Sequence, residues 1–415
     1  MTGDVVIVGA SVAGVALART LRSSGFTGRV RLVDRETEEP YDKPPLSKGR
    51  LEEPVRLLTR PEAERLGLEL LLGVEATGLD TAARRLALSD GSRIGYGALV
   101  IATGVRARRS PWIGPGVHVL RTLADARALH ADLAQGGDLV VVGAGFIGAE
   151  VASTAIDQGC RVTLVDPLTS PPARVVGQSV GDRILTWHER AGVNLRLGRV
   201  VEALDQLADG ISVRLDDGEV LRADHVVVGI GAEVDVDWLA GSGLHLEDGI
   251  ACDPHGRALG ADDVGEGRVG EGRVGEGRVG EGQVFAAGDV ARWAAADGAP
   301  GRRIEHWNSA QEQARCIAAT LLDPERPQSP SAVPMVWSDQ HGRTVQVLGA
   351  VDPGVEPRLV EDGDRLLALW DDGGRVTGAV SLGWPRGALA ARRAIANGAA
   401  VTAVVDTVAP REAAR

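Results

Sequence analysis

Short runs of valine, isoleucine and leucine alternate with stretches of helical length through the first part of the chain. The run at 4–14 ends in spaced glycines, and the run at 29–34 ends in an aspartate. A third run, 99–104, ends in small residues. Continuous apolar runs that are separated by helical lengths predict buried parallel strands joined in βαβ units.

The same order of features occurs a second time along the chain. The runs at 138–148, 161–166 and 226–232 again bring spaced glycines, a terminal aspartate and small residues. An internal repeat of this size predicts two related units in tandem. The predicted fold class is therefore α/β, with two Rossmann-like dinucleotide-binding domains.

The last part of the chain has a different pattern. A helix is predicted over 309–322, and the segment 323–334, with four prolines, is predicted to be a linker. Beyond it, short strand-like runs alternate with turns that contain DPG, EDGD and DDGG, and a final helix is predicted over 387–397. This pattern is typical of a small α+β domain.

A five-residue repeat, VGEGR or VGEGQ, occupies 264–283 in four copies. Eight glycines in twenty residues, with alternating glutamate and arginine, cannot form a packed face. The repeat is predicted to be a solvated, mobile insertion or a protruding ribbon. An anion-binding or partner-docking loop is the alternative interpretation.

Charge and cysteine content exclude several classes of protein. Lys and Arg number 45 and Asp and Glu 57, so the net charge of −12 argues against a nucleic-acid binder. The chain has no secretory pattern at its start and no apolar run of membrane-spanning length. Its three cysteines form no CxxC pair and no Cys/His cluster with zinc spacing. We expect a reduced, cytoplasmic protein that has no structural metal and no contact with a membrane.

Two glycine motifs carry the candidate chemistry. In each, small residues let the backbone approach a pyrophosphate, the helix N-terminus faces the phosphates, and a later acid accepts from ribose hydroxyls. A tight βα turn without a ligand is the alternative for the first motif, in which a serine replaces the middle glycine. The candidate residues are Gly9, Ser11, Ala13, Gly14 and Asp34 in the first motif, and Gly143, Gly145, Phe146, Ile147, Gly148 and Asp166 in the second.

The two motifs are predicted to hold different cofactors. Asp166 favours a free 2′-hydroxyl and would repel a 2′-phosphate, and the first arginine after it is Arg174, so NADH is predicted over NADPH. Farther along the chain, the run 284–289 ends in Gly288 and Asp289, which can place an acid on the ribityl hydroxyls of a flavin. Two dinucleotide sites in one chain predict that FAD and NADH exchange a hydride.

Several further segments of the chain resemble a known family. Besides the glycine motifs, the chain contains PYDKPPLSK at 40–48, LRTLADA at 120–126, IEHWNSAQEQ at 304–313 and PMVWSDQ at 334–340. These segments resemble the FAD-dependent pyridine-nucleotide reductases, and most of all the ferredoxin and rubredoxin reductases that serve Rieske oxygenases and bacterial cytochromes P450. The resemblance covers the chain apart from the glycine-rich insertion.

The resemblance implies a glutathione-reductase-like fold in three domains. The FAD-binding domain is expected at 1–111 and 240–323, with the glycine-rich repeat inserted in its second part. The NADH-binding domain is expected at 112–239, and the small α+β domain at 324–415.

The resemblance also assigns roles to particular residues. Lys48 and Glu150 are expected to form the catalytic pair beside the reactive edge of the flavin, where nicotinamide stacks. A solvated loop lysine, a first-turn acid and a core tryptophan are the alternatives for Lys48, Glu150 and Trp307. Further contacts to FAD are expected from Lys43, Ala76, Ala102, Thr103, Gly104, Arg121, Gly288, Asp289 and Trp307, and further contacts to NADH from Glu150 and Gly231.

The expected function follows from the family and from one absence. The segment 40–48 contains no cysteine, so electrons cannot leave through sulfur as they do in disulfide reductases. We expect a monomeric or homodimeric NADH:ferredoxin reductase that passes single electrons to a [2Fe-2S] ferredoxin, which feeds an oxygenase or a P450. The candidate docking residues are Arg302, Arg303, Arg386, Arg392 and Arg393. The alternatives are an NADH-dependent reductase of a quinone, a radical or oxygen, and a flavin-bound redox sensor or interaction protein.

Overall fold

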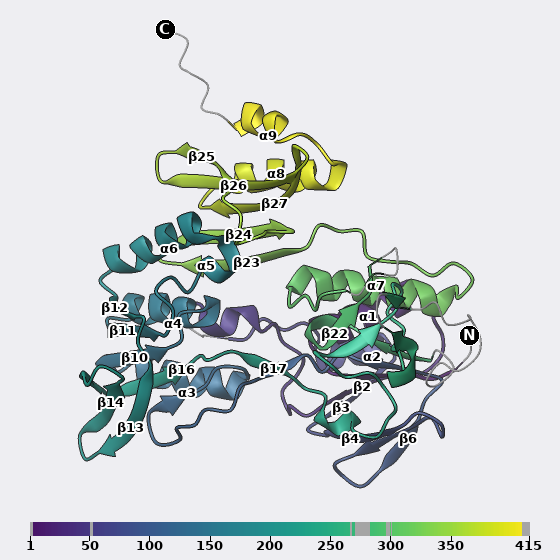
Figure 1. The fold of residues 1–415 in the computed structure, drawn as a ribbon. Helices are drawn as coiled ribbons and strands as arrows, with labels where there is room; N and C mark the ends of the chain where they lie inside the picture. The colour runs from purple at the N-terminus through teal and green to yellow at the C-terminus, as the bar shows by residue number, and fades with distance from the viewer. Residues whose placement is uncertain are drawn as a thin grey trace. The chain divides into compact units, whose positions relative to one another are not determined.

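The computed structural model describes residues 3–49, 53–265, 268–269, 283–295, 299 and 301–408 (Figure 1). The chain divides into two compact units. Unit 1 contains Met1–Asp42, Val55–Arg106 and Glu233–Ala332, and unit 2 contains Lys43–Pro54, Ala107–Ala232 and Val333–Arg415.

A five-stranded parallel sheet forms the centre of unit 1. Its order is β21-β7-β1-β2-β3, and every residue of β1 is buried because both faces of the sheet are covered. Helix α1 (Val12–Ser23) packs against helix α7 (Trp307–Leu322). The strands are β1 (Val5–Val8), β2 (Val30–Asp34), β3 (Leu68–Leu72), β7 (Ala98–Ile101) and β21 (Val284–Ala286).

The remaining elements of unit 1 are short. Helix α2 spans Arg60–Arg65, and a 3-10 turn spans Gly288–Val290. An antiparallel sheet is formed by β4 (Ala76–Asp80), β5 (Arg85–Leu88) and β6 (Arg93–Gly95). A parallel pair is formed by β18 (Ile250–Cys252) and β22 (Ala291–Trp293). The short strands β8 (Val105–Ala107) and β17 (Ala232–Val234) each extend one residue beyond unit 1, because Ala107 and Ala232 belong to unit 2.

The glycine-rich repeat falls only partly within the described residues. Strand β19 (Val264–Gly265) pairs with β20 (Arg268–Val269) in an antiparallel manner. The rest of 264–283, apart from Gln283, lies outside the described residues, so the prediction of a mobile insertion or a ribbon stays a prediction.

Unit 2 contains a second five-stranded parallel sheet, of order β12-β11-β10-β16-β9. Helix α3 (Leu123–Leu133) begins at a capping box between Thr122 and Asp125, and helix α4 (Phe146–Asp157) follows the glycine turn after β10. The strands of this sheet are β9 (Val117–His118), β10 (Asp138–Val142), β11 (Arg161–Asp166), β12 (Asn194–Leu197) and β16 (His225–Val228).

The two parallel sheets are built alike. The order β7-β1-β2-β3 in unit 1 corresponds to β16-β10-β11-β12 in unit 2. A three-stranded antiparallel sheet accompanies each; in unit 2 it consists of β13 (Val201–Leu207), β14 (Gly210–Leu215) and β15 (Val220–Ala223). The predicted pair of Rossmann-like folds is therefore confirmed.

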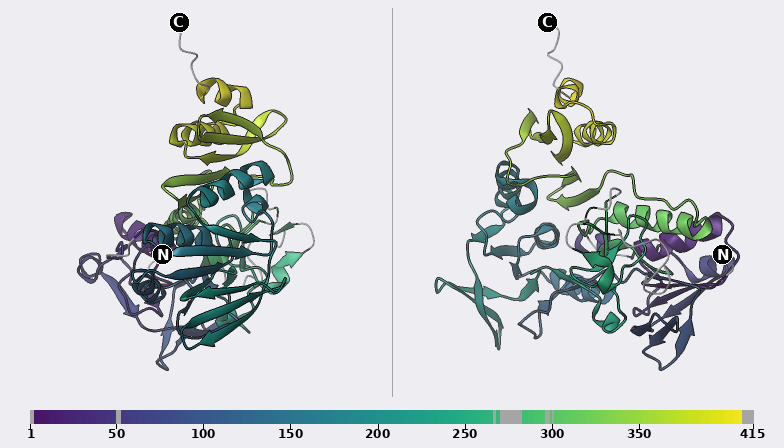
Figure 2. Two further views of the ribbon diagram at one scale, coloured as in Figure 1. Left: turned by 90° about the vertical axis from the view of Figure 1, so that its left-hand side faces the viewer. Right: turned by 45° about the vertical axis from the view of Figure 1, so that its right-hand side comes forward.

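The yellow-green end of the chain in Figure 2 contains strands and helices. Its strands form an antiparallel sheet of order β23-β24-β27-β26-β25. Its side chains alternate between two helical layers, as the two-residue period of a strand requires. Leu367 and Leu369 pack with helices α8 (Pro385–Asn397) and α9 (Val401–Val408). The strands are β23 (Met335–Gln340), β24 (Arg343–Gly349), β25 (Arg358–Asp362), β26 (Arg365–Asp372) and β27 (Arg375–Leu382).

The opposite face of this sheet is covered by a helical segment from the middle of the chain. Leu366 and Trp370 of β26 pack with residues of α5 (Ala173–Val176) and α6 (Gln178–Arg190). The predicted α+β character of the last domain is confirmed, and its sheet is sandwiched between two pairs of helices. Within the described residues, no helix is both long and apolar enough to cross a membrane.

Candidate active site

The first glycine turn brings most of its predicted residues together at the carboxyl ends of β1, β7 and β21. Gly9 has a φ of +105°, and a Cβ there would lie 2.2 Å from the carbonyl oxygen of Ala102. A Cβ on Gly14 would lie 2.0 Å from the carbonyl oxygen of Gly9. Gly288 lies beside Ala13, since a Cβ on Gly288 would be 3.5 Å from that of Ala13. Such close backbone approach at strand ends is what a dinucleotide turn needs.

The second glycine turn repeats this geometry after β10. Gly143 has a φ of +103°, and a Cβ there would lie 2.3 Å from the carbonyl oxygen of Gly229. A Cβ on Gly148 would lie 1.9 Å from the carbonyl oxygen of Gly143. Gly145 caps helix α4 with a φ of −70°, and among the described residues only the guanidinium of Arg174 lies near the position of its Cβ, at 3.6 Å. The turn therefore leaves the N-terminus of α4 open toward a phosphate.

The acids that end the second strand of each sheet are bonded to backbone in the same way. Asp34 Oδ2 accepts from the Ala10 amide at 2.6 Å, and Asp166 Oδ2 accepts from the Ala144 amide at 2.8 Å. Their other oxygens accept from Glu36 and Leu168. A carboxylate has about four acceptor positions, so each acid can still accept from a ribose hydroxyl.

One cation near the second turn was not predicted as a site residue. Arg174 is the second residue of the short helix α5, and its guanidinium lies beside Gly145 at the start of α4. Its contact with the turn could not be predicted, because helix α4, strand β11 and a loop separate Arg174 from the glycine motif in the chain. A guanidinium at a helix N-terminus adds positive charge where a pyrophosphate would lie.

The other predicted residues of unit 1 lie around the same strand ends. Thr103 Oγ1 donates to the carbonyl oxygen of Asp235 at 3.0 Å, and Gly288 N donates to Gln313 Oε1 at 2.8 Å. The indole of Trp307, the first residue of α7, donates to Asp42 Oδ1 at 2.9 Å and is half-buried. The predicted residues that belong to unit 1 are Gly9, Ser11, Ala13, Gly14, Asp34, Ala76, Ala102, Thr103, Gly104, Gly288, Asp289 and Trp307.

Three residues predicted to contact FAD, Lys43, Lys48 and Arg121, belong to unit 2. Arg121 lies at the start of α3, where its amide donates to Asp125 at 3.1 Å. Gly231 follows β16 with a φ of +108° and open space around it. These positions are observed, while their roles toward a cofactor stay predictions.

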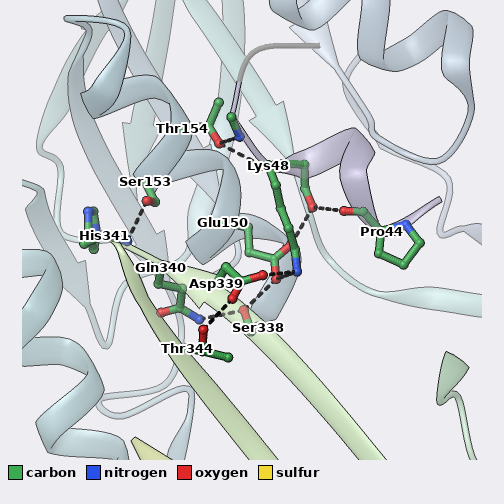
Figure 3. Close-up of polar contacts among 12 residues, drawn as sticks. Pro44, Lys48, Glu150, Ser153, Thr154, Ser338, Asp339, Gln340, His341 and Thr344 are labelled. Carbon is green, nitrogen blue, oxygen red and sulfur yellow. Dashed lines mark hydrogen bonds and ion pairs between the residues drawn. The ribbon is translucent and has the colours of Figure 1, made fainter. Parts of the chain in front are cut away.

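A buried ion pair lies beside the start of α4 in unit 2 (Figure 3). Lys48 Nζ is 3.5 Å from Glu150 Oε1 and 2.8 Å from Asp339 Oδ2, and it lies 5.2 Å from the centroid of the Trp337 ring. The Glu150 side chain is only 4% exposed, that of Lys48 20% and that of Asp339 43%. Lys48 is therefore not a solvated loop lysine.

Helix α4 explains why the carboxylate is buried. Its glycine and three alanines let it pack closely against the sheet, against β23 and against the turn at Pro44–Ser47. Glu150 lies beyond the first turn of α4, so the alternative of a first-turn acid is wrong. Burial raises the pKa of Glu150, and Lys48 and the hydroxyls of Ser47 and Ser338 offset part of this rise.

Asp339 is a third member of this charged cluster, and it was not among the residues predicted from the sequence. It is 291 residues from Lys48 in the chain, and only the resemblance of the segment 334–340 pointed to its strand. Its other oxygen accepts from Thr344 Oγ1 at 2.7 Å. Although burial raises the pKa of Asp339, hydrogen bonds from Lys48 and Thr344 outweigh this and lower it.

A chain of hydrogen bonds extends from Glu150 along β23 (Figure 3). Ser338 Oγ donates to Glu150 Oε1 at 2.7 Å and accepts from Gln340 Nε2 at 3.0 Å. Gln340 Oε1 is 3.1 Å from His188 Nε2, and His188 Nδ1 is 2.9 Å from His341 Nε2. With Gln340 in this orientation, neutral His188 carries its proton on Nε2. Every donor in this row of hydrogen bonds, from His341 to Ser338, then points toward the Glu150 carboxylate.

The stability of the protein is expected to fall in acid because of His188. Burial lowers the pKa of His188 to about 4, from an ordinary value of 6.5, and His341 contributes to this lowering. The unfolded imidazole takes up its proton near the ordinary pKa and the folded one only near the lowered pKa. The contribution of His188 is thus present above pH 6.5 and is lost as the pH falls toward 4. It amounts to about 3 kcal/mol at most.

Unfolding in urea between pH 4 and 7 tests this expectation. His188→Gln should flatten the dependence of the unfolding midpoint on pH in this range, because glutamine does not titrate. His255→Gln, which replaces a more exposed imidazole in unit 1, serves as the control and should leave the dependence as it is. Equal slopes for wild type and His188→Gln would contradict the assignment.

The fold and the site together define a class of protein. Two dinucleotide turns on tandem Rossmann-like units, with a buried lysine–glutamate pair after the second, are features of a two-cofactor oxidoreductase.

Comparison with known proteins identifies the family. Residues 3–314 match the pyridine nucleotide-disulphide oxidoreductase family, and residues 335–409 match the reductase C-terminal family. The chain belongs to the pyridine nucleotide-disulphide oxidoreductases, as predicted from the sequence. It is thus an oxidoreductase of a family that uses FAD and NAD(P)H.

Two relatives that match this chain over most of their own length are named as reductases of a redoxin. Rhodocoxin reductase of Rhodococcus erythropolis is 34% identical over 95% of this chain and 89% of its own. Putidaredoxin reductase of Pseudomonas putida is 33% identical over 88% of this chain and 87% of its own. The solved covalent complex of putidaredoxin reductase with putidaredoxin superposes with a TM-score of 0.84 at 30% identity, over 95% of this chain and 93% of that one.

Proposed function

We propose that this chain is an NADH:ferredoxin reductase, which uses bound FAD to pass electrons to a [2Fe-2S] ferredoxin that feeds an oxygenase or a cytochrome P450. The observation that supports this most is the Lys48–Glu150 pair, buried directly after the second of two dinucleotide turns. The full-length similarity to ferredoxin reductases supports the same activity.

The residues of unit 1 fit an FAD molecule. Gly9 and Gly14 allow the backbone approach that a pyrophosphate needs, and Asp34 can accept from a ribose hydroxyl. Asp289 follows Gly288 in the turn after β21, where an acid can accept from ribityl hydroxyls. The flavin, when bound, supplies the chemistry that accepts a hydride and releases single electrons.

Lys48 and Glu150 would fix the charge beside the reacting rings. The Lys48 ammonium is held by two carboxylates, so one positive charge faces two acids, one buried and one half-exposed. Such a fixed cation stabilises negative charge that develops on a reduced flavin. Glu150 holds the ammonium in place and is itself held by Ser47 and Ser338.

The second turn favours NADH over NADPH. The Asp166 carboxylate lies 8% exposed at the end of β11, where it would repel a 2′-phosphate. Arg174 lies beside Gly145 and is placed to neutralise the pyrophosphate rather than to replace the acid. The ratio of kcat/KM for NADH and NADPH measures this preference, and a preference for NADPH would contradict it.

The visible spectrum and the turnover of cytochrome c test the proposed function. Purified protein should be yellow, NADH should bleach it, and reduction of cytochrome c should require an added [2Fe-2S] ferredoxin. Turnover without ferredoxin would support a reductase of a quinone, a radical or oxygen. Tight NADH binding with negligible turnover would support a redox sensor. A colourless protein that cannot be reconstituted with FAD would overturn the proposal.

The same assay tests the charge of the docking surface. Arg386, Arg392 and Arg393 are exposed on α8, and Arg302 is also exposed. Arg303 forms ion pairs with Asp248 and Glu305, so its charge is already paired within the protein. If these arginines bind an acidic ferredoxin, the rate should fall steeply with salt. The cytoplasmic location and the monomeric or homodimeric state predicted from the sequence are part of this proposal.

A further inference from the structure

Three polar side chains gather at one edge of the parallel sheet in unit 2. His118 ends β9, the outermost strand, and His225 begins the neighbouring strand β16. In the register of the two strands, His118 lies opposite Val227, two residues after His225, so both imidazoles are on the same face. Asp132 comes from α3, whose Leu129 and Leu133 pack with Val227 on that face.

The two imidazoles share one carboxylate oxygen. His118 Nε2 is 2.8 Å from Asp132 Oδ2, and His225 Nδ1 is 3.4 Å from the same oxygen. The three ligand atoms all lie within 4.8 Å of one another. The side chains are 11%, 14% and 27% exposed for His118, His225 and Asp132, so the cluster is largely dehydrated but open to entry from solvent.

Within the described residues, His225 Nδ1 is buried and makes no hydrogen bond, although Asp132 is near. A buried nitrogen without a partner is unfavourable, because it has lost its hydrogen bond to water. A hydrogen bond from His118 already occupies Asp132 Oδ2. The cluster thus places two imidazole nitrogens within 3.4 Å of one carboxylate oxygen.

These distances and ligand types suit a divalent transition metal. In a tetrahedral site with metal–ligand bonds near 2.1 Å, neighbouring ligand atoms are about 3.4 Å apart. The two observed separations, 2.8 and 3.4 Å, are close to this value. Two imidazoles and one carboxylate are ligands that zinc accepts, with water in the fourth position.

We propose that His118, Asp132 and His225 form a binding site for Zn²⁺ or a similar divalent transition metal. The bound ion would tie the edge strand β9 to β16 and α3, and it would give His225 Nδ1 a partner. The site lies apart from the nucleotide turn, since His225 is beside Leu139 at the start of β10 and Gly143 follows its end. Gly143 comes four residues after Leu139 along the strand direction, a distance of roughly 13 Å.

The sequence predicts no metal site, because it has no Cys/His cluster with zinc spacing. Here the ligands come from three separate segments and meet only through the pairing of β9 with β16 and the packing of α3. The proposal does not depend on the reductase activity, and it can fail while that activity stands.

Titration of the full-length protein with Zn²⁺, and with Co²⁺ as a spectroscopic probe, tests the site after treatment with EDTA. The variants are His225→Gln, Asp132→Asn and His118→Gln, of which the first removes a nitrogen that makes no hydrogen bond. His245→Gln is the matched control, because His245 lies 3.7 Å from Glu247 without belonging to the cluster. Zinc should raise the melting temperature of wild type by several degrees.

Wild type and His245→Gln should bind one Zn²⁺ with a Kd in the micromolar range, and each cluster variant should weaken binding by about tenfold or more. Co²⁺ should produce a visible absorption band of a four-coordinate site that the cluster variants lack. The reduction of cytochrome c should be the same in all variants without metal. Absence of binding at 100 μM Zn²⁺, or binding that survives both His225→Gln and Asp132→Asn, would overturn the proposal.

Discussion

Replacing Gly148 with alanine should lower the free energy of unfolding by about 3 kcal/mol or more and abolish binding of NADH. A Cβ at this position would lie 1.9 Å from the carbonyl oxygen of Gly143 and 3.3 Å from a side-chain atom of Val141. Both neighbours belong to the strand and turn that lead into α4, so the helix would have to move away from the sheet.

Gly145→Ala is the matched variant three residues earlier in the same turn. Gly145 has a φ of −70°, which any residue adopts, and in the part of the chain that the structure describes its Cβ would meet only a flexible guanidinium at 3.6 Å. This variant should fold as stably as wild type. It should nevertheless weaken NADH binding, because the added methyl group would fill the space that the pyrophosphate needs.

Unfolding in urea, together with titration of the protein with NADH, separates the two effects. Gly148→Ala should shift the unfolding midpoint strongly, whereas Gly145→Ala should change only the Kd for NADH. If both variants have the same unfolding midpoint, the inference that Gly148 is too closely packed to accept a Cβ is wrong. If Gly145→Ala binds NADH as wild type does, the turn after β10 is not the nucleotide site.

The parts of the fold that follow local rules could be predicted from the sequence. The strands that precede Gly9 and Gly143 were predicted because a continuous apolar run before spaced glycines permits few other structures. The helix predicted over 309–322 is α7, which begins two residues earlier at Trp307. Helix α9 was missed, because six of its eight residues are valine or threonine, which favour strands over helices. Packing against α8 is what favours the helix here.

The parts of the site that depend on long-range contacts could not be predicted. Lys48 and Glu150 were paired through a family resemblance, but nothing in their neighbourhood in the chain indicates Asp339. The direction of the hydrogen bonds from His341 to Glu150 depends on strand β23 lying against α4. The His118–Asp132–His225 cluster likewise exists only because β9 pairs with β16.

Lys48→Met should destabilise the protein by about 3 kcal/mol at pH 8, because it leaves the Glu150 carboxylate buried without a cation. Methionine has nearly the same length and no charge, so the change removes the ion pair without a large cavity. Asp339 also loses its partner, but its side chain is 43% exposed and water can replace much of the interaction.

The double variant Lys48→Met/Glu150→Gln separates the charge from the packing. A neutral amide at 150 needs no cation, so the double variant should recover most of the lost stability. Arg161→Met serves as the control, since it breaks the exposed pair between Arg161 and Asp138 and should change stability little. If the double variant is as unstable as Lys48→Met, the loss of stability comes from the packing of the lysine stem and not from its charge.

The pH dependence of Lys48→Met gives a second test of the same pair. Burial already raises the pKa of Glu150 above its ordinary 4.5, and Lys48 is the first influence that opposes this rise. A carboxyl group whose pKa is higher in the folded than in the unfolded protein adds stability at a pH below its ordinary pKa. This added stability is lost as the pH rises through the pKa of the folded state. Removing Lys48 raises the folded pKa further, so the decline should extend to higher pH. Lys48→Met should therefore be destabilised more at pH 8 than at pH 5, relative to wild type, and the double variant should show no such difference.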